Sequence, residues 1–468
     1  MLMFPHVASQ LIVDASGISS CRTLLTSRMS ATSRSVFYCV LFGVIGFSPV
    51  AIGVLDKFPY ALAPVVPVAF AVCAFIWSSS RRFKQIALLL LSVCLGVTLT
   101  DLVARPVFLH LSSARPAERY IYRWPPLPLL QRYVASVNFE GSTYGDLASA
   151  STKPEWREWH KIRFITDEYG FRNETFHPGF EARPLDVIVL GDSFGVAAST
   201  TQEETLSSVL ARDYGLSVYN LSVSREGPRH QYANLVLEGP RLKTREGADV
   251  LWLIFGGNDL DDPYNVELEN PKPGNPALLT TIATAYRDFR ARSPVRRLLA
   301  RIDTSFILER KFVDGRRMLF NDYYAQRRSR TAYDIMQHPN FEALKTTMTA
   351  MQKLTGQRGL HVSVAVVPSK EEVYAWVLDG APPWSTSPEP SGFSKVLNRL
   401  CEERGFYFID LKPTLLEEAR QEYEKSAGLI WWADDTHWNG QGQRAAARVI
   451  YQNLLAPQRL TDERLRGK

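Results

Sequence analysis

The sequence predicts an α/β protein in which helices cover both faces of a parallel β-sheet and three N-terminal transmembrane helices precede the sheet. Two observations carry this prediction. The N-terminal part of the chain contains three long apolar runs, and short β-rich runs alternate with helical stretches after them. The 468-residue chain is long enough for more than one domain. Its net charge of +6 is mild, and no feature indicates a nucleic-acid partner.

The apolar runs are residues 36–55, 60–77 and 86–103. Each is about 18 to 20 residues long, which is near the length that a helix needs to cross the hydrocarbon core of a bilayer. A buried helical hairpin in a soluble core is the alternative. The scarcity of charged residues within the runs favours membrane spans and a lipid bilayer as a partner.

Basic residues flank these runs asymmetrically, with Arg22, Arg28 and Arg34 before the first and a basic link between the second and third. Because basic loops stay cytoplasmic, we expect a multi-pass inner-membrane protein whose later residues face the periplasm or cell exterior. The expected divisions are a cytoplasmic segment (1–35, with Met29 as an alternative start), a membrane anchor (36–110), a linker or collar (111–160) and an α/β domain (161–460) with a basic helical insert near 270–345.

Five runs in the α/β domain are candidate strands: residues 186–190, 216–221, 249–255, 361–367 and 405–411. Helical segments separate most of them, which is typical of a parallel sheet. Sites in such sheets form at the carboxyl ends of the strands. The polar residues that follow these strands are therefore the candidates for chemistry.

Ser193, in the tetrapeptide GDSF, follows the first of these strands directly. A serine on such a turn is exposed, and nearby backbone N–H groups can stabilise a developing negative charge. Asn258 follows another strand after two glycines, and its amide can donate to an oxyanion. An ordinary turn is the alternative for either residue, and for Asn258 alone it is the favoured one.

His437 lies in the segment WWADDTHWNGQG, directly before Asn439, which has the position of a helix N-cap. A neutral imidazole can take the proton of a serine if a carboxylate holds its other nitrogen. Asp434 and Asp435 are both candidates for that carboxylate. A histidine that only caps the following helix is the alternative.

Ser193, Asn258 and His437 occur in an order that resembles the SGNH (GDSL-type) hydrolase superfamily. Three further segments are similar to its alginate-type polysaccharide O-acetyltransferase branch: residues 166–173 (TDEYGFRN), 368–374 (PSKEEVY) and 435–438 (DTHW). The resemblance implies a flavodoxin-like, three-layer α/β/α domain. It also implies a serine nucleophile at Ser193, an oxyanion-hole side chain at Asn258 and a base at His437.

The oxyanion hole departs from the family pattern at one position. Relatives often carry a glycine five residues after the Asn of the second block, where this chain has Arg225, and Gly227 follows two residues later. Because a backbone N–H is the donor, Arg225 can still supply it, with the N–H of Ser193 as another donor.

The resemblance leaves the partner of His437 open. Many members of the superfamily have the aspartate three residues before the histidine, which selects Asp434, and the alginate-type branch has it two before, which selects Asp435. In an extended segment, residues two apart share a face, and this favours Asp435.

Residues 286–330 carry thirteen Lys/Arg against five Asp/Glu, interleaved with aromatic residues. A solvated helical face is the simple interpretation. The alternative is a surface that guides an anionic polymer to Ser193. Candidate substrate-binding residues are Trp438, Arg296, Arg297, Arg316 and Arg317.

The sequence thus predicts a serine acyl-ester enzyme, and the resemblance implies that it transfers or removes O-acetyl groups on a cell-surface polysaccharide. A separate membrane protein is expected to supply the acyl group. No cofactor or metal is expected, since no zinc-ligand spacing occurs. The alternatives are a non-catalytic glycan-binding or assembly protein, and an esterase acting on lipid or peptide.

Overall fold

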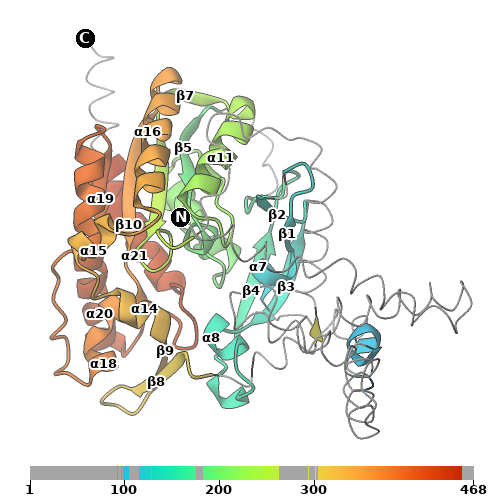
Figure 1. Cartoon of the computed structure of the whole chain (residues 1–468), viewed down its shortest axis with the longest axis vertical. Coiled ribbons are helices and arrows are strands. Elements are labelled where there is room, and N and C mark those ends of the chain that lie inside the picture. The colour runs from blue at the N-terminus through green and yellow to red at the C-terminus, as the bar shows by residue number, and fades with distance from the viewer. Residues whose placement is uncertain are drawn as a thin grey trace, which may run out of the picture. The chain divides into compact units, whose positions relative to one another are not determined.

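The computed structural model describes residues 92, 96, 99–104, 115–127, 129–174, 183–262, 293–294, 301 and 304–455. The chain divides into two units, and Figure 1 labels the helices and strands of the described residues. One consists of Met1–Leu111 with Ala283–Ala300, and the other of Ser112–Ile282 with Arg301–Lys468. The candidate residues Ser193, Asn258 and His437 all belong to the second unit.

In the described part of the chain, no helix combines the length and the apolar character that crossing a bilayer requires. This finding corrects the prediction of three N-terminal transmembrane helices and of a multi-pass inner-membrane protein. The physical reason is that apolar length alone does not distinguish lipid from protein as the surroundings of a helix. The predicted spans 36–55 and 60–77 lie outside the described residues, as does most of 86–103.

The second unit contains a five-stranded, all-parallel sheet with the strand order β11-β10-β7-β5-β6. Its strands are β5 (Leu185–Leu190), β6 (Val218–Asn220), β7 (Thr244–Phe255), β10 (His361–Val367) and β11 (Tyr407–Asp410). Counted along the chain, the order is 2-1-3-4-5, the flavodoxin-like arrangement. The five strands coincide closely with the five predicted runs.

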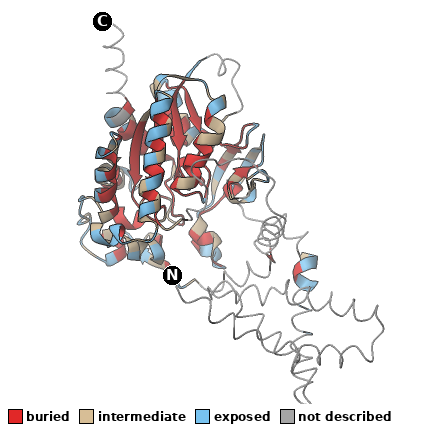
Figure 2. Ribbon diagram, turned by 45° about the horizontal axis from the view of Figure 1, so that its top comes forward, coloured by how far each residue is buried: buried red, intermediate tan, exposed pale blue. Residues whose placement is uncertain are grey.

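Successive side chains of the central strands enter two different hydrophobic cores, because neighbours in a strand point to opposite faces. Val187 and Val189 of β5 belong to one core, together with residues of α10, α20 and α21. Ile188 and Leu190 belong to the other, together with residues of α11, α16 and α19. The sheet is therefore buried on both faces, and the outer faces of the helices are exposed (Figure 2).

Amphipathic helices of this three-layer domain bury a stripe of apolar residues. In α16 the buried side chains include Leu344, Met348 and Met351, at the spacing of one helical face. The larger helices are α10 (Leu206–Tyr214), α11 (Pro228–Glu238), α16 (Phe341–Gln357), α19 (Gly392–Glu402), α20 (Lys412–Ser426) and α21 (Gly440–Ile450).

The described part of the segment predicted as a linker or collar contributes short elements to the second unit. These are α7 (Pro116–Arg119), α8 (Asp146–Ser149) and two antiparallel pairs: β1 (Ile121–Arg123) with β2 (Gln131–Tyr133), and β3 (Asn138–Thr143) with β4 (His160–Ile165). Some of its basic and aromatic residues pack within the protein. The Arg132 guanidinium, for example, lies over the Phe171 ring.

The described part of the predicted basic insert forms a hairpin followed by short helices. The elements are β8 (Ile307–Lys311), β9 (Arg317–Asn321), α14 (Asp322–Arg327) and α15 (Ala332–Met336). Two further short helices, α17 (Lys370–Val373) and α18 (Ala375–Asp379), follow β10. The backbone N–H of Leu319 in β9 donates to the carbonyl of Ala433 at 2.8 Å. The hairpin is thus tied to the segment that carries His437.

Candidate active site

Ser193 is the first residue of α9 (Ser193–Val196), the short helix that follows β5. Asp192 caps this helix, since its carboxylate accepts the backbone N–H of Phe194 at 2.8 Å. Gly195 allows a close approach, because a Cβ there would lie 2.2 Å from the Ser222 hydroxyl oxygen. This tight turn places the Ser193 hydroxyl at the carboxyl end of the sheet.

The hydroxyl of Ser193 lies next to the imidazole of His437, although the two residues are 244 positions apart in the chain. The Ser193 Oγ and His437 Nε2 atoms are 2.6 Å apart. On the other side of the ring, Nδ1 lies 2.5 Å from Oδ1 of Asp435. The three side chains therefore form a continuous serine–histidine–aspartate arrangement, which has the geometry of a base-activated nucleophile.

Asp435 is fully buried and receives hydrogen bonds on both carboxylate oxygens. Its Oδ2 accepts the hydroxyl of Ser199 at 2.5 Å and the backbone N–H of Asp146 at 3.0 Å. The Arg115 guanidinium lies 3.3 Å from the same oxygen. These three partners leave Oδ1 directed toward His437.

Asp434 points away from the histidine. Its Oδ2 accepts the backbone N–H groups of Gly145 and Glu158, each at 2.8 Å. A Cβ at Gly145 would lie 2.0 Å from the Asp434 carbonyl oxygen, so the two segments are in close contact. Asp434 thus joins the histidine segment to the region before β4 and does not contact the imidazole.

The local conformation differs from the extended one that favoured Asp435 in the sequence. Residues 433–437 form a turn, in which Asp435 Oδ1 also accepts the backbone N–H of His437 at 2.9 Å. A bridge between Trp431 and Trp438 closes the turn. Asn439 then caps α21 as the sequence predicts, by accepting two backbone N–H groups.

The charges of the arrangement suit a general base. Burial alone would raise the pKa of Asp435, but the Arg115 guanidinium and His437 hold it well below its usual range. Burial would lower the pKa of His437, and the Asp435 carboxylate raises it above its ordinary value. Asp435 is therefore an anion, and His437 is more basic than a free imidazole.

Asp146 is a second carboxylate near the same imidazole. It accepts the Thr436 hydroxyl at 2.5 Å, and its Oδ2 lies 3.7 Å from His437 Nδ1. Burial and repulsion by Asp435 raise the pKa of Asp146. Asp146, Asp435 and His437 also have the ligand types of a metal site. A metal ion there would compete with His437 for Asp435 and would be repelled by the positive charge of Arg115.

A cavity of about 200 Å³ opens at Ser193 and His437. Its lining includes Asn258, Arg225 and Tyr324. The side-chain oxygen of Asn258 is buried and has no hydrogen-bond partner in the described part of the chain. Asn258 thus faces the cavity from the end of β7, at the point in the sheet where the strand order reverses.

Arg225 and Gly227 were the two alternatives for the backbone donor after the second block. Arg225 lines this cavity and Gly227 does not. Gly227 is instead the residue that precedes α11. The backbone φ of Arg225 is +66°, in the left-handed region that favours glycine. Arg225 therefore adopts a conformation that glycine takes without strain, at a cost of about 1–2 kcal/mol.

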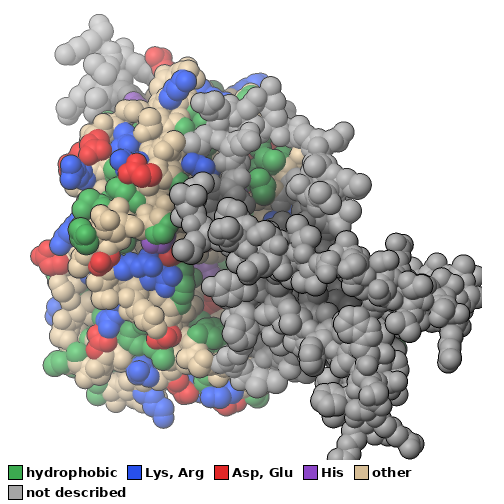
Figure 3. Space-filling view, in the orientation of Figure 1, with side chains coloured by type: hydrophobic (Ala, Val, Ile, Leu, Met, Phe, Trp, Pro, Cys, Tyr) green, Lys and Arg blue, Asp and Glu red, His purple; other side chains and the backbone are tan. Residues whose placement is uncertain are grey.

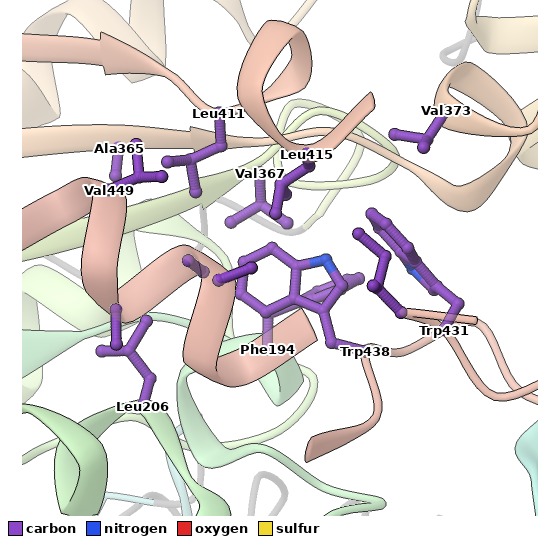
Figure 4. Close-up of a cluster of buried hydrophobic side chains, with 14 of the residues drawn as sticks. Phe194, Leu206, Ala365, Val367, Val373, Leu411, Leu415, Trp431, Trp438 and Val449 are labelled. Carbon is purple, nitrogen blue, oxygen red and sulfur yellow. The ribbon is translucent and has the colours of Figure 1, made fainter. Parts of the chain in front are cut away.

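None of the candidate substrate-binding residues that the structure describes lines the cavity. Trp438 lies fully in the core, where its ring packs against Phe194 (Figure 4), and this corrects its assignment to substrate. Arg316 pairs with Asp314 at 2.8 Å, and Arg317 lies 3.7 Å from Glu309. Neither of these arginines lines the cavity. Arg296 and Arg297 lie outside the described residues.

Sequence reasoning missed four residues around the arrangement: Arg115, Asp146, Ser199 and Tyr324. None lies in a recognisable motif, and two belong to the segment that was interpreted as a linker. Arg115 reaches its hydrogen-bond partner Ser199 across 84 positions of sequence. No pattern within the sequence indicates such a contact.

Comparisons with known proteins agree with this geometry over part of the chain. Residues 323–466 match a family model described as "SGNH hydrolase-like domain, acetyltransferase AlgX". The match confirms the resemblance for the segment that contains His437 and both aspartates, and it supports acyl-ester chemistry. It does not extend to Ser193 or Asn258.

No curated protein matches the chain. Solved structures do match, among them a psychrotrophic esterase EstA from Pseudoalteromonas sp., inhibited by monoethylphosphonate. It is 14% identical, with coverage of 57% of this chain and 95% of that chain and a TM-score of 0.30.

Proposed function

We propose that the protein is a serine acyl-ester enzyme that passes an acyl group, through an acyl-enzyme at Ser193, to a polysaccharide hydroxyl or to water. The observation that carries the proposal is the continuous contact from Ser193 through His437 to Asp435. The family match adds acetyl as the acyl group that fits best.

The proposed reaction begins when His437 Nε2 takes the Ser193 proton while Oγ attacks the acyl carbonyl. Asn258 and backbone N–H groups, including that of Arg225, stabilise the negative oxygen that forms. The protonated His437 then gives its proton to the departing oxygen, which leaves Ser193 acylated. An acceptor hydroxyl, deprotonated by His437, attacks the acyl-enzyme and releases Ser193.

Labelling by a fluorophosphonate probe tests the nucleophile directly. We expect the probe to modify Ser193 in the full-length protein and to leave Ser193→Ala unlabelled. His437→Ala should react at least about 100-fold more slowly, because general-base catalysis is lost. Absence of labelling in folded protein would favour the non-catalytic binding protein.

The choice between transferase and esterase is tested by the acceptor. Mass spectrometry of surface polysaccharide from cells that carry Ser193→Ala is expected to show altered O-acetylation. Less acetyl than in wild-type cells supports transfer to the glycan, and more acetyl supports removal. Unchanged acetylation would reject polysaccharide as the substrate. The lipid or peptide esterase and a separate acyl-donor protein stay as untested predictions.

Arg225 provides a test of whether the acceptor polysaccharide is acidic. Its side chain is exposed at the cavity and has no ion pair with an acid in the described part of the chain. On the face that Figure 3 shows, basic and acidic side chains of the described residues are interspersed. We include in the proposal that Arg225 contacts an acidic group of the polysaccharide.

Arg225→Gly keeps the backbone N–H and suits the positive φ, so turnover of a small neutral acetyl ester should stay within about threefold of wild type. The KM for an acidic polysaccharide should rise about tenfold, which corresponds to the loss of one charge-assisted hydrogen bond. Arg316→Gly is the control, because Arg316 lies away from the cavity lining. An equal rise of KM in both variants would contradict a specific contact at Arg225.

A further inference from the structure

Lys370 is the one lysine that is fully buried in the described part of the chain. It is the first residue of α17, directly after the Ser369 cap. Its ammonium donates to the carbonyl oxygen of Asp435 at 2.6 Å and approaches those of Trp432 and Ala433 at 3.4 and 3.5 Å. A single ammonium thus contacts three backbone carbonyls of the turn that carries His437.

Burying an ammonium group costs several kcal/mol, and an apolar side chain usually stabilises a core better. Burial lowers the pKa of Lys370, against the attraction of Glu371, Asp146, Asp435 and Asp434. In the described part of the chain, its hydrogen bonds go to backbone oxygens and not to any of these carboxylates. The contact therefore fixes the backbone conformation around Asp435.

The turn lies between strand-like Trp431 and the start of α21, and neighbouring segments also hold it, for example through the hydrogen bond from the Leu319 N–H to the Ala433 carbonyl. Asp435 is held at two ends: Lys370 binds its carbonyl oxygen, and Ser199 binds its carboxylate. Glu371, the next residue, accepts the backbone N–H of Asn321 at 2.7 Å and so joins α17 to β9. The start of α17 is thereby fixed to the turn around Asp435 on one side and to β9 on the other.

We propose that Lys370 is a positioning residue, which holds the backbone of residues 432–435 so that Asp435 meets His437 Nδ1 and His437 Nε2 meets Ser193. This inference rests on the proposed function in one respect only, because the kinetic measurement assumes the acyl-ester reaction. A displacement of about 1 Å in a catalytic group can reduce a rate about 100-fold.

The test compares Lys370→Met with Lys370→Arg in the full-length protein. Two measurements are made: the kcat and KM for a small acetyl ester, and the far-downfield proton resonance of the His437 Nδ1–Asp435 hydrogen bond. Lys370→Met should lower kcat about 100-fold with KM within about threefold, and should shift or broaden the resonance. Lys370→Arg keeps charge and donors, so it should retain the resonance and at least about tenfold more kcat than the methionine variant.

Lys412→Met is the matched control, because the Lys412 ammonium also binds a backbone carbonyl, that of Glu389, at 2.7 Å away from the site. It should match wild type in both measurements. If Lys370→Met does not fold, Lys370→Gln replaces it with the same expectations.

An unchanged resonance and kcat in the folded Met or Gln variant would overturn the proposal. So would an equal loss of both in Lys370→Arg. A resonance that moves in Lys370→Met, in a protein without esterase or transferase activity, would support the positioning role and reject the proposed function.

Discussion

Ser193→Ala is expected to lower kcat for a small acetyl ester by about 10⁴–10⁶-fold, the largest effect of any single substitution in this chain. Alanine removes the atom that would carry the acyl group and leaves the His437–Asp435 contact without a nucleophile. The fold should be unaffected, since both hydrogen bonds of the Ser193 hydroxyl, with His437 and with Asp192, lie at the cavity. Steady-state kinetics and a thermal melt together measure both expectations.

His437→Ala and the double variant Ser193→Ala/His437→Ala sharpen this result. Residues that act as one unit lose activity non-additively, so the double variant should be no slower than Ser193→Ala alone. Ser208→Ala, in α10, is the control and should retain wild-type turnover. A further large loss in the double variant would mean that His437 acts independently of Ser193, against the proposed mechanism.

Asp435→Asn is expected to lower kcat by about 10⁴-fold, because an amide cannot hold the imidazole in the tautomer that accepts the serine proton. The substitution also removes the anion that raises the pKa of His437. The acidic limb of the kcat/KM profile reports this pKa, since His437 must be neutral to act as a base. In wild type the limb should lie above the ordinary histidine pKa of about 6.5, and in Asp435→Asn it should move to lower pH.

Asp434→Asn is the matched control on the neighbouring residue. Burial raises the pKa of Asp434 to about 7, so the wild-type side chain is partly neutral near physiological pH. An amide oxygen can still accept the N–H groups of Gly145 and Glu158, so kcat should fall by less than about tenfold. The opposite ranking of the two variants would mean that Asp434 orients His437.

The sheet was predictable because most of its strands are buried on both faces and therefore appear as nearly continuous apolar runs. The run at residues 186–190 corresponds to β5, and the run at 361–367 has the same bounds as β10. Ser193 and Asn258 were predictable as neighbours for a related reason. Parallel strands end at the same edge, so the residues that follow them meet there.

The surroundings of Asp435 were not predictable. Arg115 and Ser199 reach it over long separations in the chain, and their residue types carry no motif. The preference for Asp435 agrees with the contact in the structure, but its local reason was wrong. The side chain reaches His437 through a turn closed by a hydrogen bond to the His437 backbone N–H, and not through an extended segment.

The N-terminal apolar runs illustrate the limit of composition. Hydropathy measures how poorly water solvates a segment and does not identify what covers it instead. The basic residues near 286–330 show a similar limit, because the net charge of a segment does not show which of its side chains form ion pairs. Arg327 and Arg330 both bind Asp261, so their charge is partly neutralised within the fold.

The separation of 244 residues between Ser193 and His437 also has a consequence for biosynthesis. Ribosomes add about 5–20 residues per second, so the serine is made roughly 10–50 s before its base. During that interval the nascent polypeptide carries an unactivated alcohol, which is no better a nucleophile than any other serine. Reactivity toward esters would therefore appear only after translation has passed the histidine and the turn has closed against the finished sheet.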